Sequence, residues 1–257
     1  MNISEKILID GFKIIDLIKK DEFDTLTDIV YSEFSAALDN SNVSNPLITK
    51  EQLRTYHKFS IDINHNEFWS KQKRIITNNN LNKILKMNFI KELKNIFGDF
   101  KISNEEGIQS EEIYWRLVRP KIESDVGPIH ADKWFWEGMN RYNLIHKELA
   151  FERIKLWIPL YTELGISGLK IMPNSHIQEF DHEITYKNGR VKIDKKFDDK
   201  NLDFLILKLI DGQAVAFHDN LLHGGLVGEN ETRLSLEFTI LKKWGKNENR
   251  ILWEDTA

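Results

Sequence analysis

His130-Ala131-Asp132 places an imidazole and a carboxylate two residues apart in a segment with β-strand character. Side chains two apart on a strand point to the same face of the sheet. A second histidine, His223, lies 91 residues beyond Asp132 and precedes two glycines, which let the backbone turn sharply. Two histidines and one carboxylate can form a facial triad that binds iron(II) and leaves positions open for small ligands. The pattern therefore predicts a β-sheet protein whose distant strands meet at a metal.

Arg233 is the next informative residue, because it follows His223 by ten positions in a strand-like run. It shares one face of that strand with Ser235. A guanidinium and a hydroxyl on one face can bind a single carboxylate, the guanidinium through two parallel hydrogen bonds. The alternative is an ordinary solvated face of an edge strand. We expect Arg233 to anchor a carboxylate close to the metal.

The order of helical and β patterns along the chain predicts the fold class. Apolar residues recur at helical spacing over 21–38, and two or three amphipathic helices are predicted within 50–99, the clearest over 81–97. Short strands are predicted at 9–17, 113–119, 153–161, 168–172, 204–210, 214–218 and 233–242. Helices followed by short strands predict a mainly β protein with flanking helices. Its core would be a double-stranded β-helix, the cupin-like jelly roll, with a helical N-terminal part.

One domain over residues 1–257 accounts for this organisation. A helix-rich part, 1–110, is expected to pack on a jelly-roll core, 111–243. Two stretches interrupt the strand pattern, namely 137–152 and the charged, hairpin-like 181–203. Long loops between the strands of a β scaffold commonly recognise the substrate. We expect 137–152 to fold over the site as a lid.

Composition restricts the class of partner. The net charge is -4, from 36 basic and 40 acidic residues, which argues against nucleic acid. No apolar run reaches the roughly 20 residues of a membrane helix, and no signal peptide is expected. The absence of cysteine fits a reducing compartment, so a cytoplasmic location is expected. A small molecule is the predicted partner, and the composition sets no oligomeric state.

The chain resembles the phytanoyl-CoA dioxygenase-like branch of the iron(II)/2-oxoglutarate oxygenases. Beyond the metal and arginine motifs, the matching pieces are Asp10-Gly11-Phe12, Trp157-Ile158-Pro159-Leu160, residues 168–176 and residues 211–217. The family has glycine where this chain has Asn174, a residue that tolerates left-handed backbone geometry. His218 is the alternative third histidine, but it lies fifteen residues before Arg233. The resemblance spans nearly the whole chain, and only the metal and arginine motifs are specific.

The resemblance implies a role for each motif. His130, Asp132 and His223 would bind iron(II), and Arg233 would bind the distal carboxylate of the cosubstrate 2-oxoglutarate. Ser235 would be a second contact to that carboxylate. Trp157 would line the cosubstrate pocket, with simple core packing as its alternative.

The substrate side is expected to follow directly after Asp132. Trp136 takes the place of a substrate-stacking tryptophan in one relative. Trp134 and Trp136 would share a face with the metal residues if the chain stays extended. These features imply a dioxygenase that uses O2 to hydroxylate a small polar metabolite and releases succinate and CO2. The alternatives are a cupin-like metal enzyme that does not use 2-oxoglutarate and a non-catalytic small-molecule-binding protein of the same fold.

Overall fold

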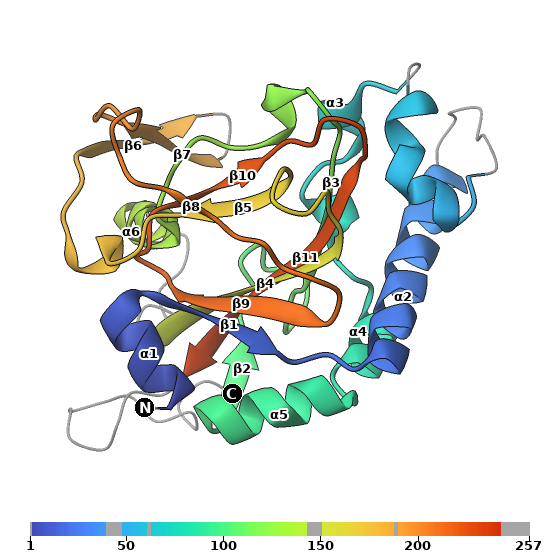
Figure 1. Cartoon of the computed structure of the whole chain (residues 1–257), viewed down its shortest axis with the longest axis horizontal. Helices are drawn as coiled ribbons and strands as arrows, with labels where there is room; N and C mark the ends of the chain where they lie inside the picture. Colours follow the sequence, from blue (N-terminus) through green and yellow to red (C-terminus); the bar gives the residue numbers. More distant parts are fainter. Residues whose placement is uncertain (1, 40–47, 61–62, 143–150, 188–189, 243–257) are drawn as a thin grey trace.

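The computed structural model describes residues 2–39, 48–60, 63–142, 151–187 and 190–242. Two β-sheets pack together, a separate hairpin lies beside them, and helices cover the outer face of the larger sheet (Figure 1). This arrangement confirms the predicted mainly β fold with flanking helices. Within the described ranges, no helix is both long enough and apolar enough to cross a membrane.

The larger sheet carries core residues on one face and site residues on the other. Its order is β1-β9-β4-β11-β2, with β3 also paired to β11. The strands are β1 Phe12–Asp16, β2 Phe100–Ile102, β3 Tyr114–Val118, β4 Glu152–Tyr161, β9 Gln213–His218 and β11 Arg233–Lys242. Along β11, Leu234 and Leu236 belong to the main hydrophobic core. The alternate positions, including Arg233 and Glu237, therefore point toward the second sheet.

The smaller sheet closes the other side of the barrel. It has the order β10-β5-β8, formed by β10 His223–Leu226, β5 Gly168–Ile171 and β8 Leu205–Ile206. Apolar residues from both sheets, such as Trp157, Ile171 and Phe217, form a second core cluster between them. β10 differs from the sequence prediction, which interpreted Gly224 and Gly225 as a break. A Cβ on Gly224 would lie 2.6 Å from Cδ1 of Ile129, so glycine lets the segment that contains Ile129 approach β10 closely.

The predicted hairpin within 181–203 is confirmed as β6 His182–Lys187 paired with β7 Arg190–Lys195. It packs on helix α6, Asp132–Arg141, through Gly138. A Cβ on Gly138 would lie 2.4 Å from Cγ1 of Val191, so the close approach depends on glycine. The predicted lid at 137–152 begins inside α6, and its residues 143–150 lie outside the described part of the chain.

Helices from the first hundred residues cover the outer face of the larger sheet (Figure 1). The longest is α2, Lys20–Asp39, which confirms the helix predicted at 21–38. Phe34 of α2 contacts Trp69 and Trp115, the last of these on β3. The remaining helices are α1 Ile3–Asp10, η1 Glu51–Lys58, α3 His65–Phe68, η2 Gln72–Arg74, α4 Asn78–Ile84, α5 Asn88–Phe97, η3 Glu123–Asp125 and η5 Ser175–Ile177.

Helix α1 includes the first two residues of the strand predicted at 9–17 and ends at Asp10, with Gly11 as its C-cap. Asn2 and Glu5 form a capping box, in which the Asn2 side chain accepts from the Glu5 N–H at 2.8 Å. The reciprocal bond, from the Asn2 N–H to the Glu5 carboxylate, is 2.9 Å long. Capping satisfies backbone donors that the first helical turn would leave free. The strand therefore begins only at Phe12.

The single helix predicted at 81–97 is in fact two helices, α4 and α5. Two buried glutamates of α2 accept hydrogen bonds where these helices begin. Glu33 accepts from the N–H of Thr77 at 3.0 Å, and Glu22 accepts from the N–H of Phe89 at 3.1 Å. The break between α4 and α5 is therefore stabilised by side chains from a distant helix.

Candidate metal centre and its two cavities

His130 and His223 are held together by the backbone before their side chains are considered. The N–H of each residue donates to the carbonyl of the other, at 3.0 and 2.9 Å. Each imidazole also uses Nδ1 to contact a backbone carbonyl two residues earlier, at Pro128 and Leu221. An Nδ1–H that donates there leaves Nε2 with a free lone pair, which is the arrangement that metal-binding histidines need.

Asp132 completes a compact set of three ligand atoms. Its carboxylate oxygens lie 3.6 Å from Nε2 of His130 and 3.9 Å from Nε2 of His223. One ligand atom from each residue lies within 4.8 Å of the others. The structure therefore brings together the three predicted ligands. His218 stays outside this set, and its Nδ1 accepts from the N–H of Asn220 at 3.0 Å.

The protonation states of these groups suit a divalent cation. Burial alone would raise the pKa of Asp132, but Lys155 and the two histidines hold it well below its usual range. Burial, reinforced by His130, lowers the pKa of His223 to about 4. The site thus offers an ionised carboxylate and a neutral imidazole at pH 7. Oδ2 of Asp132 is buried with no hydrogen-bond partner, and a metal ion would satisfy it.

The residues after Asp132 are helical, so the expectation of an extended segment there is wrong. Ala131 has extended backbone geometry and α6 begins at Asp132. Helix geometry separates Trp134 from Trp136. Trp134 stacks on His182 of the hairpin at 4.3 Å and lines neither cavity. Trp136 lines the larger cavity, and the guanidinium of Arg153 lies 5.2 Å from its ring centroid.

A small cavity of about 90 Å³ extends from the three ligands into the barrel. Arg233 lies in its wall and is only 2 % exposed. One terminal nitrogen of its guanidinium donates to the carbonyl of Gly168, and Nε has no partner. Burial, followed by repulsion from Arg116, lowers the pKa of Arg233 to about 9, so it stays charged at neutral pH. Among the described residues, no carboxylate lies within ion-pair distance of this guanidinium.

Two further predicted residues lie near Arg233. Trp157 lines the small cavity, and its ring centroid is 5.9 Å from the central carbon of the guanidinium. Ser235 follows Arg233 on the same face of β11 and does not line either cavity. Its hydroxyl is buried without a partner. The small cavity therefore has a metal-ligand set near one end and an unpaired guanidinium in its wall.

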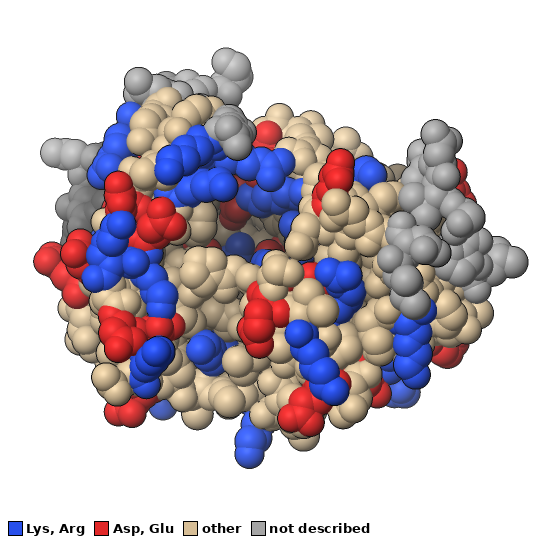
Figure 2. Space-filling view, turned by 90° about the horizontal axis from the view of Figure 1, so that it is seen from above, with Lys and Arg blue, Asp and Glu red and all other residues tan. Residues whose placement is uncertain are grey.

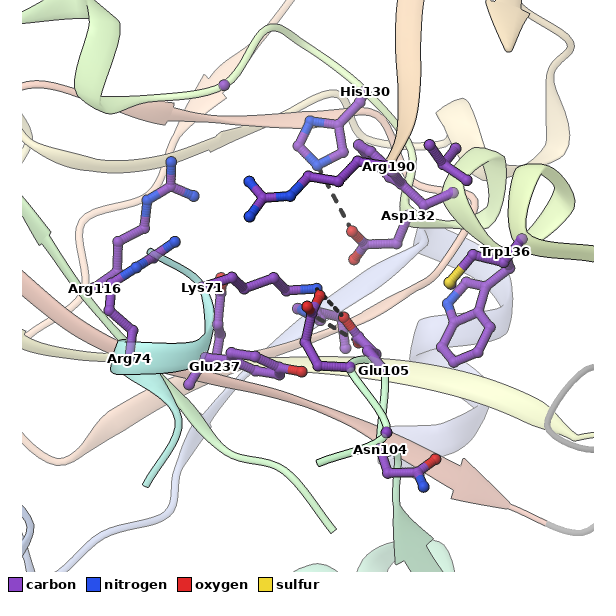
Figure 3. Close-up of a pocket in the computed structure, with 18 of the residues that line it drawn as sticks. Lys71, Arg74, Asn104, Glu105, Arg116, His130, Asp132, Trp136, Arg190 and Glu237 are labelled. Carbon is purple, nitrogen blue, oxygen red and sulfur yellow. Dashed lines mark hydrogen bonds and ion pairs between the residues drawn. The ribbon is translucent and has the colours of Figure 1, made fainter. Parts of the chain in front are cut away.

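A second cavity of about 770 Å³ opens from His130 and Asp132 to the surface. Figure 2 shows that this face of the molecule is hollowed, with lysine and arginine side chains gathered beside the opening. Figure 3 shows Trp136 on one side of Asp132 and Arg74 and Arg116 on the other. Phe135 and Met139 of α6 add apolar wall beside Trp136. The cavity therefore has one apolar side and one strongly charged side.

Charged residues that sequence reasoning missed form the floor of the larger cavity. Lys155 of β4 lies 3.8 Å from Glu105, which also contacts Lys71 at 3.3 Å. Burial alone would raise the pKa of Glu105, but Lys155 and Lys71 lower it overall. Burial alone would lower the pKa of Lys155, but the charges of Glu105 and Asp132 raise it overall. Lys155 could have been found from the sequence, because it is a charged residue within the apolar run of β4. Glu105 lies in a loop after β2 and has no such sequence feature.

No model of a known protein family matches the sequence, and no characterised protein in the curated set matches it either. Solved structures do resemble the fold. ThoJ, a non-heme monooxygenase, superimposes with a TM-score of 0.60 at 12 % identity, over 94 % of this chain and 77 % of its own. AviO1 from Streptomyces viridochromogenes Tue57 gives 0.53 at 12 % identity, over 97 % and 96 %.

SnoN is a third structure that resembles this chain. It is an epimerase that was solved with Fe3+, alpha-ketoglutarate and nogalamycin RO. Its TM-score is 0.53 at 12 % identity, over 93 % of this chain and 82 % of its own. At such identities the likeness concerns the fold. The predicted jelly-roll core is therefore confirmed, and the chain has the same fold as ThoJ and SnoN.

Proposed function

We propose that the protein is an iron(II)- and 2-oxoglutarate-dependent dioxygenase that hydroxylates a small polar metabolite. One observation carries this proposal: two sets of buried, unsatisfied polar atoms lie in or beside the small cavity. One set is Oδ2 of Asp132 beside the two imidazoles, and the other is Nε of Arg233 with Oγ of Ser235. 2-Oxoglutarate carries a keto acid at one end and a second carboxylate at the other. Its two ends match these two sets.

His130, Asp132 and His223 would hold the iron, and Arg233 would hold the distal carboxylate of 2-oxoglutarate. Bound iron(II) and 2-oxoglutarate supply the oxidation by O2, with succinate and CO2 as products. The chain orients the cosubstrate through the charge-assisted fork of Arg233. Trp157 and Phe217 line the small cavity and exclude water from it. The apolar side of the larger cavity, with Trp136, would hold the substrate close to the metal.

The same proposal covers the organisation and the family of the chain. Strands β1 and β2 belong to the larger sheet although they lie within the first 110 residues. This pairing supports one domain over 1–257 in which the helical part and the jelly roll form a single unit. The order of the motifs supports a place in the phytanoyl-CoA dioxygenase-like branch. O2 and a small molecule would be the partners of the site.

Anaerobic titration with iron(II) and 2-oxoglutarate tests the proposal. Chelation of iron by a keto acid gives a weak visible charge-transfer band, for which the triad leaves adjacent positions open. His223→Ala should abolish the band, and the matched control His218→Ala should leave it. The reverse result would show that the ligands are assigned wrongly. Formation of succinate and a product that gains one oxygen atom would distinguish a hydroxylase from an enzyme that does not use 2-oxoglutarate and from a binding protein.

A further inference from the structure

Three arginines on the charged side of the larger cavity have no carboxylate partner within ion-pair distance among the described residues. They are Arg74 of η2, Arg116 of β3 and Arg190 of β7. Three other described arginines each form an ion pair at 3.1 Å or less: Arg54 with Glu231, Arg119 with Asp125 and Arg153 with Asp219. Five described arginines have no ion pair with a described residue, and three of these five gather at this cavity.

Two of the three guanidinium groups are held in place by the backbone. Arg116 donates to the carbonyl of Asp125 at 2.9 Å, and Arg74 donates through Nε to the carbonyl of Trp69 at 3.1 Å. The Asp125 carboxylate is itself fixed by two hydrogen bonds of 2.9 Å from the side chain of Arg119. Each held guanidinium has five N–H donors, so most donors remain for a ligand. The groups are therefore oriented before a ligand arrives.

The positive charges of Arg74, Arg116 and Arg190 lie close together in the larger cavity. Burial, followed by the charge of Arg116, lowers the pKa of Arg74 to about 10. Arg190 extends from the hairpin across the cavity toward the side on which Arg74 and Arg116 lie (Figure 3). Mutual repulsion of this kind costs free energy unless an anion offsets it.

The residues that line the larger cavity also carry a net positive charge. Five basic residues line it, namely Lys71, Arg74, Arg116, Lys155 and Arg190. Three glutamates oppose them, namely Glu105, Glu106 and Glu237, once Asp132 is assigned to the metal. Lys71 and Lys155 contact Glu105, and Lys71 also contacts Glu106 at 2.8 Å. An excess of two positive charges remains on the arginine side, in a chain whose net charge is -4.

We propose that Arg74, Arg116 and Arg190 bind the phosphoryl group of the substrate, which is a small phosphate monoester. The inference rests on the proposed function, because it specifies the substrate class of the same site. A carboxylate has two oxygens in one plane and is satisfied by one guanidinium fork. A phosphoryl group has three terminal oxygens and a charge of about -1.5 to -2 at pH 7, which matches three donors and the excess charge. Asp132 lies between the arginines and Trp136, so the rest of the substrate would extend past the metal (Figure 3).

Four probes test the proposal: phenyl phosphate, benzoate and phenol, which share one ring, and inorganic phosphate, which has none. Each is titrated by calorimetry into the iron(II)–2-oxoglutarate complex without oxygen. Phenyl phosphate should bind at least tenfold more tightly than benzoate or inorganic phosphate, and phenol should not bind measurably. Arg116→Gln and Arg190→Gln should each weaken phenyl phosphate roughly 10- to 100-fold, as expected for a hydrogen bond to a charged group.

The control is Lys73→Gln, which removes a neighbouring exposed cation that does not line the cavity and should change nothing. Arg190 is exposed, so its replacement should leave folding intact even if Arg116→Gln is unstable. Equal binding of benzoate or inorganic phosphate, no binding of phenyl phosphate, or an unchanged affinity in both arginine variants would each overturn the proposal. The visible band of the cosubstrate complex separates the two hypotheses. If the band is absent, the proposed function fails; if it is present without these arginine effects, only the phosphoryl site fails.

Discussion

Replacing Arg233 by glutamine keeps a hydrogen-bond donor in the small cavity and removes the guanidinium charge. The side chain is 2 % exposed, and its terminal nitrogen already contacts the Gly168 carbonyl. A charge-assisted fork in such a site contributes about 2–3 kcal/mol, so its loss should weaken 2-oxoglutarate roughly 30- to 150-fold. Arg233→Lys should recover only part of this affinity, because an ammonium cannot reproduce the fork.

Anaerobic titration of the visible band with 2-oxoglutarate measures this affinity directly. Iron binding should be nearly unchanged in both variants, since Arg233 is not among the three grouped ligands. Ser235→Ala should give a smaller loss, because an uncharged hydroxyl donates only one hydrogen bond to the carboxylate. If Arg233→Gln binds 2-oxoglutarate as tightly as the wild type while remaining folded, the carboxylate anchor must be another residue and the small cavity has been misinterpreted.

Three further predictions concern the surroundings of the site. Trp136→Ala should retain the visible band but lose or uncouple oxidation of a substrate found by screening, and unchanged turnover would exclude Trp136 from the substrate wall. Burial lowers the pKa of His65 from 6.5 to about 4, so the unfolded chain takes up a proton first as the pH falls. Between pH 6.5 and pH 4 the free energy of unfolding should therefore fall by about 2–4 kcal/mol more in the wild type than in His65→Gln, measured by urea unfolding; His223, whose pKa is also lowered to about 4, contributes equally to both proteins. Gly138→Ala should destabilise the fold by about 1–3 kcal/mol through overpacking against the hairpin, whereas Gly127→Ala, where a Cβ meets nothing within 4 Å, should not; equal urea midpoints would contradict this packing.

Strands could be predicted from the sequence where core residues and site residues alternate along them. β4 and β11 alternate between core residues and site residues, and their predicted limits agree with the structure within a residue. β10 was missed because Gly224 and Gly225 resemble a turn, although here glycine allows another segment to approach. The segment 132–141 was also mispredicted. Its aromatic residues fit a strand and a helix equally well over so few positions, and tertiary contacts with the hairpin favour the helix.

The candidate site also has some residues that could be predicted from the sequence and others that could not. His130, Asp132 and His223 could be predicted, because motif spacing and neighbouring glycines are local features of the sequence. The pairing of Lys155 with Glu105 could not, since the two residues lie on elements 50 positions apart. Ion pairs of this kind depend on which strands become neighbours. The sequence pattern of a single strand does not contain that information.

The backbone bridge between His130 and His223 would link metal binding to the folding of two distant segments of the chain. These two residues are separated by 93 positions, and their hydrogen bonds form only when the segment before α6 reaches β10 of the smaller sheet. The unfolded chain therefore has no preformed site, and the free energy of metal binding adds to that of folding. At a free metal concentration one hundred times the Kd, the gain would be about 2.7 kcal/mol. Iron should thus rescue variants whose barrel is weakened far from these residues, and thermal stability in its presence would report formation of the bridge between His130 and His223.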